Sequence, residues 1–237
     1  MDNQRHFQHK ATLPAIIVML VISIGLLLYG FLNFENQTTL PQGANQSAIG
    51  IRLGENESDI SVKQLQNSGI SFVYLDSIHG TDSFNTSYKK FRRQISKTKL
   101  AFGTIIHVDL HESPLKQVQY LYEKIGTNLG SLPIMLIFDK KKLTNADLKM
   151  LSQLINQLNA NHEVMVKSSS RYAKYLPQNS KFLAVSDDVP NKLAYCFWQY
   201  TDHGHVKNVT NLTDSVTMYA YIGTSAQYKE KYGSLTQ

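Results

Sequence analysis

The sequence predicts an α/β protein: an eight-stranded TIM-like (β/α) barrel with few late helices, preceded by one transmembrane helix. Three observations lead to this prediction. Eight strand-like segments follow one another from Ala48 onward, the early ones are separated by amphipathic helices, and an uncharged run of 18 residues precedes them all. Strands that alternate with helices are typical of a parallel sheet, and eight such strands can close into a barrel.

The uncharged run extends from Ala15 to Leu32, and a helix of about 20 apolar residues crosses the core of a bilayer. A cleaved secretory signal is the alternative, but its apolar region is normally roughly 7–15 residues long, and no small-x-small cleavage site follows here. Arg5 and Lys10 precede the run, and Lys and Arg gather on the cytoplasmic side of membrane spans. We therefore expect a single-pass anchor in the cell membrane, with a cytoplasmic amino terminus and an extracellular carboxyl-terminal domain.

This interpretation divides the chain into four regions. They are a cytoplasmic tail at residues 1–12, the transmembrane anchor at 13–33, a polar linker at 34–47 and the barrel domain at 48–237. The linker contains Pro41 and Gly43 and has no apolar periodicity, as is typical of an irregular connection.

The composition limits what the external domain can be. Cys196 is the only cysteine, so no internal disulfide can form and stability must come from a packed core. A Cys-His peptidase would need a reactive thiol, whereas Cys196 lies within a strand-like segment, where a buried inert thiol is the better interpretation. The formal net charge of +6 favours contact with an anionic polymer or anionic lipid heads, or it is only a solubility margin.

The predicted elements follow in order along the chain. Helices are expected near residues 58–66, at 88–97, after Ser113-Pro114 up to Gly126, after the capping residue Thr144, and briefly around 172–176. The predicted strands are Ala48–Leu53, Ile70–Leu75, Leu100–His107, Leu132–Asp139, Glu163–Lys167, Lys181–Val185, Leu193–Tyr200 and Val216–Ile222.

Asp139 is the first candidate site residue, because it ends a buried apolar strand and barrel active sites gather at the carboxyl ends of the strands. Asp76 follows the second strand, and Asp109 and Glu112 follow the third, so each could supply a further carboxylate. Acidic residues in loops are also commonly just solvated, and without geometry we favour that interpretation.

Two further groups were weighed. His107, Asp109 and His111 share strand parity and could form a metal site, but no second cluster completes it, and we expect no metal. Trp198 and Tyr200 share one strand face, and aromatic side chains at a barrel mouth commonly stack on sugar rings, although core packing explains them about equally well.

Several segments in this order resemble glycoside hydrolase family 25, the barrel lysozymes or N-acetylmuramidases. The likeness covers roughly residues 48–233, and its pieces are Gly50-Ile51, Gly69–Leu75, Gly103–His107, Leu132–Asp139, and Trp198-Gln199-Tyr200-Thr201 followed by Gly204 and Val206. Similar proteins cleave the β-1,4 bond between N-acetylmuramic acid and N-acetylglucosamine in peptidoglycan and use no cofactor. The resemblance therefore implies glycan strands as the partner, together with the membrane through one helix, and no nucleic acid.

This sequence departs from the family pattern where the chemistry lies. Where the family has Gly-Ile-Asp-Val-Ser, this sequence has Arg52 at the Asp position and Gly54 at the Ser position. Where the family has Asp-x-Glu, this sequence has Ile137 at the Asp position and Asp139 at the Glu position. The family's late Val-Asp-x-Asn has no clean counterpart; Asp214 is the nearest carboxylate, and Thr217 stands in the place of the acid.

Glycoside hydrolysis normally needs two carboxyl groups, one protonated and one ionised. Arg52 cannot serve as a base, and a nearby cation lowers a carboxyl pKa, which is the wrong direction for a general acid. We therefore expect a lysozyme-like domain that binds peptidoglycan with weak or lost catalysis. The alternative is an active N-acetylmuramidase in which Asp139 works with a relocated second carboxylate, Asp76. We expect Arg52, Asp76, His107, Asp139 and Trp198 to gather at the barrel mouth, with Arg52, His107, Trp198 and Tyr200 contacting the glycan.

Overall fold

The computed structural model describes residues 12–35, 37–43, 47–57, 59–213 and 215–233. It divides into two compact units, residues 1–37 and residues 38–237. The elements in chain order are α1 (Thr12–Glu35), β1 (Ile49–Leu53), η1 (Glu55–Glu57), α2 (Val62–Asn67), β2 (Phe72–His79), β3 (Ser83–Phe84), α3 (Tyr88–Ile95), β4 (Ala101–His107), α4 (Pro114–Ile125), β5 (Ile134–Ile137), α5 (Asn145–Asn159), β6 (Val164–Lys167), η2 (Ser170–Tyr175), β7 (Lys181–Val185), β8 (Phe197–Gly204), β9 (Val216–Tyr221) and α6 (Ser225–Tyr232).

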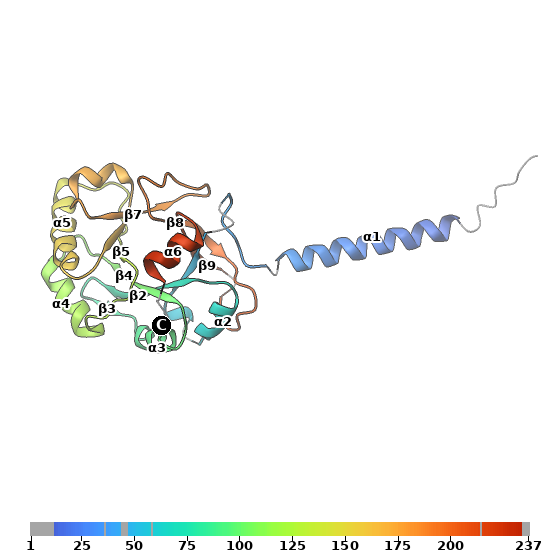
Figure 1. The fold of residues 1–237 in the computed structure, drawn as a ribbon, viewed down its shortest axis with the longest axis horizontal. Coiled ribbons are helices and arrows are strands. Elements are labelled where there is room, and N and C mark those ends of the chain that lie inside the picture. The colour runs from blue at the N-terminus through green and yellow to red at the C-terminus, as the bar shows by residue number, and fades with distance from the viewer. Residues whose placement is uncertain (1–11, 36, 44–46, 58, 214, 234–237) are drawn as a thin grey trace, which may run out of the picture. The chain divides into compact units, whose positions relative to one another are not determined.

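The second unit is an α/β barrel closed by eight strands, which confirms the predicted fold class of this domain (Figure 1). The strands pair in the order β1, β2, β4, β5, β6, β7, β8, β9 and back to β1, and the short β3 is added at the edge of β2. All eight barrel strands coincide with predicted strands, and only their ends differ.

The last strand departs from a fully parallel (β/α) barrel. β9 is antiparallel to both of its neighbours, β8 and β1, whereas the other six pairs around the barrel are parallel. Parallel neighbours need a crossover that is usually helical, whereas antiparallel neighbours can be joined without one. Among the described residues between β8 and β9 there is no helix, but the β7–β8 connection also lacks one and that pair is parallel, so the missing helix does not by itself set the direction of β9.

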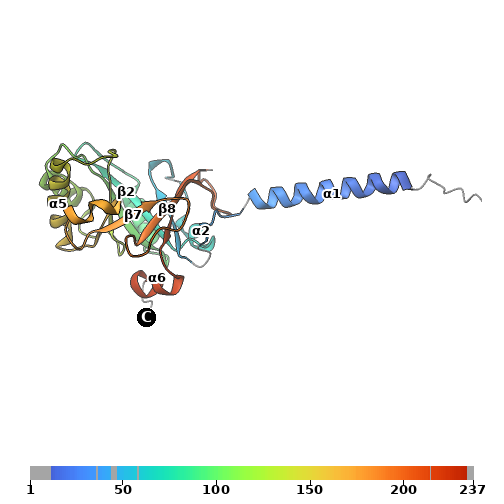
Figure 2. The ribbon, with the colours of Figure 1, turned by 90° about the horizontal axis from the view of Figure 1, so that it is seen from above.

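The barrel interior is filled by side chains that alternate along the strands. Phe72 and Tyr74 of β2, Phe197 of β8 and Tyr219 of β9 pack together there as one cluster. Tyr228 and Tyr232 of α6 join this cluster, and Figure 2 shows α6 lying across one end of the strands. Strand side chains of the opposite parity face the helices, and they form part of a second, larger hydrophobic cluster. One end of the barrel is thus plugged by aromatic rings, which leaves the other end for a site.

Local signals in the sequence explain the helix ends. Thr144 caps α5 in a capping box, in which its hydroxyl accepts from the Asp147 amide at 3.3 Å and the Asp147 carboxylate accepts from the Thr144 amide at 2.6 Å. α4 begins after Ser113 with a proline in its first turn and ends at Gly126, whose φ of 76° lies in the region that favours glycine. These ends agree with the prediction, whereas α6 was not predicted.

The first unit contains α1, whose described side chains, those of residues 14–29, are exposed. In the part of the chain that the structure describes, no helix proves both long and apolar enough for a membrane crossing. The span at 13–33 accordingly stays a prediction. Within the predicted linker, Thr39 belongs to the second unit: its amide donates to the His205 carbonyl at 2.9 Å, and its hydroxyl accepts from the His205 amide at 2.9 Å.

Candidate functional site

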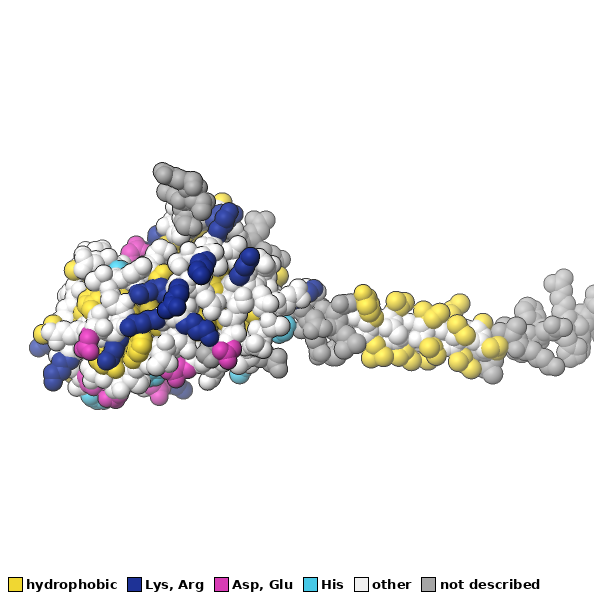
Figure 3. Space-filling view, turned by 90° about the horizontal axis from the view of Figure 1, so that it is seen from below, with side chains coloured by type: hydrophobic (Ala, Val, Ile, Leu, Met, Phe, Trp, Pro, Cys, Tyr) yellow, Lys and Arg dark blue, Asp and Glu magenta, His cyan; other side chains and the backbone are white. Residues whose placement is uncertain are grey.

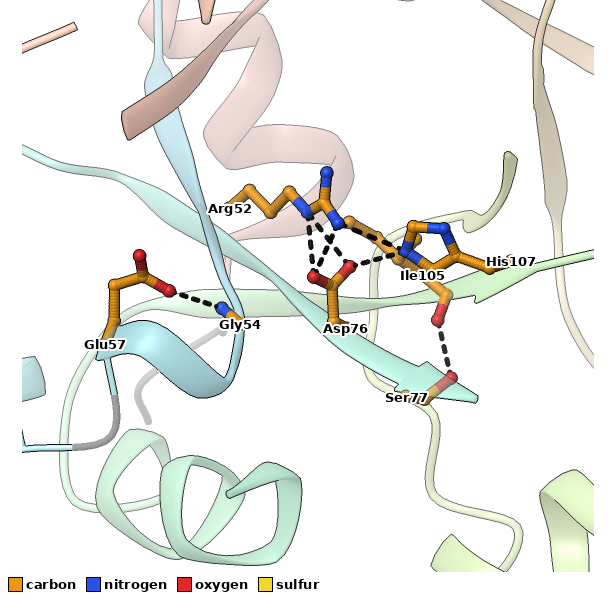
Figure 4. A network of polar contacts seen from close by, with 7 residues as sticks. All are labelled: Arg52, Gly54, Glu57, Asp76, Ser77, Ile105 and His107. Atoms are coloured by element: carbon orange, nitrogen blue, oxygen red, sulfur yellow. Dashed lines mark hydrogen bonds and ion pairs between the residues drawn. The ribbon is translucent and has the colours of Figure 1, made fainter. Parts of the chain in front are cut away.

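Three charged or titratable side chains meet at the open end of the barrel (Figure 4), and we call Arg52, Asp76 and His107 the mouth cluster. Arg52 Nε donates to both carboxylate oxygens of Asp76, at 3.0 and 2.8 Å, and Arg52 Nη2 lies 2.7 Å from Asp76 Oδ2. His107 Nε2 lies 3.1 Å from Asp76 Oδ1 and 3.2 Å from Arg52 Nη2. Because an ionised carboxylate only accepts, Nε2 carries the proton when it bonds to Asp76.

The barrel positions these side chains by strand parity. Arg52 pairs in register with Tyr74, and Asp76 pairs with Ile105, so both follow interior residues toward the carboxyl ends of their strands. Gly54 makes room for the cluster, because a Cβ at this position would come within 3.1 Å of Asp76 Oδ2. The Gly54 amide donates to Glu57 Oε2 at 2.8 Å, which fixes the turn after β1.

The electrostatics of the cluster keep Asp76 ionised. Burial acts to raise the pKa of Asp76, but the hydrogen bond from His107 and the positive charge and hydrogen bonds of Arg52 outweigh it, so this pKa lies below its ordinary value. The side chain of Asp76 is 15% exposed and that of Arg52 is 33% exposed. The Asp76 carboxylate is therefore ionised, and the permanent positive charge of Arg52 neutralises it.

His79 extends this cluster through an irregularity in β2. The β2–β4 register shifts between Asp76 and Ile78, so Ser77 is an extra residue in the ladder, and His79 then pairs with His107. The two imidazoles stack with centroids 3.8 Å apart and planes 10° apart. Burial, followed by the neighbouring His107, lowers the pKa of His79 and favours a neutral ring.

Two cavities open at this end of the barrel. The β3 cavity, of about 470 Å³, is lined by Arg52 and Asp76, by the β3 residues Ser83 and Phe84, and by Thr217 of β9. The Asp139 cavity, of about 430 Å³, is lined by side chains of both charges, namely His79, Asp82, His107, Asp109, Asp139 and Lys167. Thr217, expected in the place of the family's late acid, thus reaches the mouth, whereas Asp214 falls outside the described residues.

Asp139 lies at the expected end of the barrel but not in the mouth cluster. It is exposed, and within the described part of the chain it has no hydrogen bond or ion pair. Ile137, the last residue of β5, pairs in register with His107 and packs against the interior cluster, and Asp139 lies beyond the end of this strand. Asp139 therefore shares a cavity with His107, and the residue paired with His107 on β5 is the hydrocarbon Ile137.

The expectation for Trp198 and Tyr200 needs correction. Trp198 is 0% exposed and packs in the cluster between the barrel and the helices, and Tyr200 is buried beside it with its hydroxyl donating to the Thr39 carbonyl at 2.9 Å. The two rings do share one strand face, but it is the outer one, because Phe197 takes the interior position. Neither ring lies where a glycan in the barrel mouth could stack on it.

Sequence reasoning missed three residues that line the Asp139 cavity: His79, Asp82 and Lys167. Lys167 could have been found, because it ends a predicted strand just as Asp139 does. His79 could not, since the parity of β2 changes at Ser77.

The metal-site alternative has no support, since His107, Asp109 and His111 form no such site. The described residues contain no group of three His, Cys, Asp or Glu side chains that could hold a metal ion. Burial raises the pKa of the Cys196 thiol to about 11, as expected for an unreactive cysteine.

Comparison with known proteins agrees with this architecture. The family model described as "Glycosyl hydrolases family 25" matches residues 51–209, about two thirds of the chain. The chain belongs to glycosyl hydrolase family 25. No curated protein matches it.

Solved structures similar to this family 25 chain come from several organisms. A family 25 glycosyl hydrolase from Bacillus anthracis has a TM-score of 0.66 at 13% identity, covering 83% of this chain and 97% of its own. A lysozyme from Streptomyces coelicolor has a TM-score of 0.61 at 14% identity, covering 78% and 96%. A family 25 lysozyme from Aspergillus fumigatus has a TM-score of 0.59 at 13% identity, covering 79% and 100%. At these identities the likeness shows the fold.

Proposed function

We propose that this family 25 domain binds peptidoglycan glycan strands at the barrel mouth and hydrolyses them weakly or not at all. The observation that carries the proposal is the mouth cluster, in which both oxygens of Asp76 are held by Arg52 and one is also held by His107. Similar structures include a bacterial lysozyme and two muramidases, and this likeness supports a wall glycan as the ligand.

The chemistry of hydrolysis argues against strong catalysis at this cluster. A general acid must be protonated at the working pH, but the pKa of Asp76 is lowered and not raised. A nucleophile or base needs a free lone pair directed at the substrate, but the Asp76 oxygens face a guanidinium that does not deprotonate. Asp76 is therefore a poor second carboxylate. This weakens the alternative of an active N-acetylmuramidase in which Asp139 works with Asp76.

An active N-acetylmuramidase is the second candidate, and one observation favours it. Asp82, Asp109 and Asp139 line the same cavity, so Asp139 has two carboxylate neighbours that could share acid and base roles. The Asp109 carboxylate accepts from the His111 amide at 2.8 Å, which commits one of its oxygens, and Asp82 is exposed. General acid and base assistance is typically worth about 10²–10⁴-fold, so even an imperfect pair would give measurable turnover.

The location of the domain is part of the same proposal. The uncharged run from Ala15 to Leu32, with Arg5 and Lys10 before it, supports a single-pass anchor that holds the barrel outside the cell. Protease added to intact, wall-stripped cells should then digest the barrel domain while a cytoplasmic marker survives. Full protection of the barrel under these conditions would contradict the orientation.

Sedimentation with insoluble peptidoglycan, followed by a reducing-end assay, separates the candidates. Binding without new reducing ends supports a glycan-binding domain. Reducing-end release that Asp139→Asn abolishes, and that the matched exposed-loop control Asp188→Asn leaves unchanged, supports the active enzyme. A folded protein that stays in the supernatant would refute both, and circular dichroism of each variant confirms that it is folded.

A further inference from the structure

A second charged feature of the barrel domain lies on α3 and the turn that follows it. We call it the α3 basic surface, and it consists of Lys89, Lys90, Arg92, Arg93, Lys97 and Lys99. No Asp or Glu occurs in the sequence between Asp82 and Asp109, so these six cations are not interspersed with acids. Figure 3 shows Lys and Arg side chains gathered in the middle of one face of the domain, over the region of α3.

Packing fixes the direction in which these cations point. Tyr88, Phe91 and Ile95, at helical spacing along α3, are buried against the barrel. The remaining positions of this short helix therefore face outward, and Lys89, Lys90 and Arg93 are exposed together with Lys97 and Lys99 beyond its end.

Most of these cations have no carboxylate partner, although Lys89 Nζ lies 5.8 Å from the centroid of the Phe84 ring. Lys90 pairs with Asp59 at 3.2 Å, and Arg92 Nη1 donates to the Ile125 carbonyl at 2.7 Å at the end of α4. Within the described residues, the other four cations, Lys89, Arg93, Lys97 and Lys99, have no carboxylate within ion-pair distance.

The stability of the helix does not account for the pattern either. Lys89 and Lys90 occupy the first turn of α3, where the helix dipole disfavours cations, whereas Arg92 and Arg93 lie in the last turn, where it favours them. Closely spaced like charges also repel one another, by a few tenths of a kcal/mol for pairs at helical spacing. Lys89 and Lys90 thus act against folding locally, which is the behaviour expected of a surface that meets an anionic partner.

We propose that the α3 basic surface binds a linear phosphodiester polymer outside the cell. Phosphate groups repeated along a chain can each meet one of several cations, which suits a row of side chains that continues from α3 into the following turn. An anionic bilayer would share this charge, but membrane-binding surfaces also insert apolar side chains. None of the large apolar residues described between Leu40 and Leu115 is exposed, so the surface offers charge alone.

This site is separate from the glycan site proposed above. The barrel mouth presents carboxylates, Asp76, Asp139 and Asp202 among them; its Arg52 is already paired with Asp76, and its Lys167 lines a cavity with Asp139, so the mouth offers mixed charge and no row of cations. The proposal therefore holds or fails independently of whether the mouth binds or cleaves glycan.

The test uses the full chain in neutral detergent micelles and fluorescently labelled synthetic poly(glycerol phosphate), with affinity measured by anisotropy. The triple variant Arg93→Gln, Lys97→Gln, Lys99→Gln removes three exposed cations that have no ion-pair partner. The matched control, Lys149→Gln, Lys192→Gln, Lys229→Gln, removes the same charge from exposed positions on other elements. Equal melting temperatures establish that both variants are folded.

Each cation near an anionic surface is typically worth roughly fivefold in affinity, so the α3 variant should bind on the order of a hundredfold more weakly. The control should stay within about threefold of the wild type, and high salt should weaken wild-type binding strongly. Equal losses in both variants would overturn the proposal, because net charge alone would then explain binding. Displacement of the polymer by phosphatidylglycerol added to the micelles, at matched phosphate concentration, would also overturn it in favour of a lipid surface.

Discussion

The ion pair between Arg52 and Asp76 should be the strongest single polar coupling that the mouth contributes to stability. Replacing either residue with alanine leaves the other charge partly buried without its partner, and replacing both removes the pair. The double-mutant cycle of Arg52→Ala and Asp76→Ala isolates the coupling free energy from the cost of truncating each side chain.

The expected magnitude follows from burial and geometry. Breaking a fully buried pair typically costs about 3–5 kcal/mol, whereas exposed pairs couple by about 0.2–1 kcal/mol. The Asp76 side chain is 15% exposed, Arg52 is 33% exposed, and the guanidinium makes two hydrogen bonds to the carboxylate, at 3.0 and 2.8 Å. Discounted for this partial exposure, the coupling should be about 2 kcal/mol.

Urea unfolding of the four proteins, all at one pH and ionic strength, measures the coupling. The pair Lys90–Asp59, whose side chains are 51% and 79% exposed, provides a matched second cycle that should give less than about 1 kcal/mol. If the Arg52–Asp76 coupling is no larger than that of Lys90–Asp59, the interpretation of the mouth as a tightly held, charge-neutralised site is wrong.

Two further predictions concern stability. The hydrogen bond from Lys140, followed by the backbone amide of Thr144, lowers the pKa of Asp147 to about 2, so the stability it provides is complete above about pH 4 and is lost as the pH falls toward 2. Asp147→Asn should flatten the acid side of a plot of melting temperature against pH, and an unchanged slope would contradict this assignment. Trp198→Ala should lower the free energy of unfolding by about 3–5 kcal/mol and Trp198→Phe by clearly less, because the indole fills core space. A chemical denaturation series that finds Trp198→Ala nearly neutral, with loss of glycan binding alone, would restore a binding role for this residue.

Much of the architecture could be predicted because the relevant physics is local. The eight barrel strands are short apolar runs, α5 begins where Thr144 and Asp147 cap each other, and α4 ends where Gly126 adopts a positive φ. Each of these features depends on residues within a few positions of one another.

The tertiary structure decided how distant segments meet. Strand parity correctly put Trp198 and Tyr200 on one face, but only barrel closure determined that this face packs against the helices, because Phe197 takes the interior position. The direction of β9 was decided in the same way, by closure between β8 and β1. Both faces of β8 carry aromatic residues, so hydrophobicity could not identify the inner one.

The mouth cluster combines both kinds of information. The sequence by itself supplied a cation at position 52, carboxylates at 76 and 139, and a hydrocarbon at 137, which is enough to question catalysis. It did not reveal that Asp76 would neutralise Arg52, because that contact joins two strands whose register is set by the whole barrel. It also did not reveal that the extra residue Ser77 would bring His79 onto His107, since a bulge depends on the partner strand and leaves no periodic signal in the sequence.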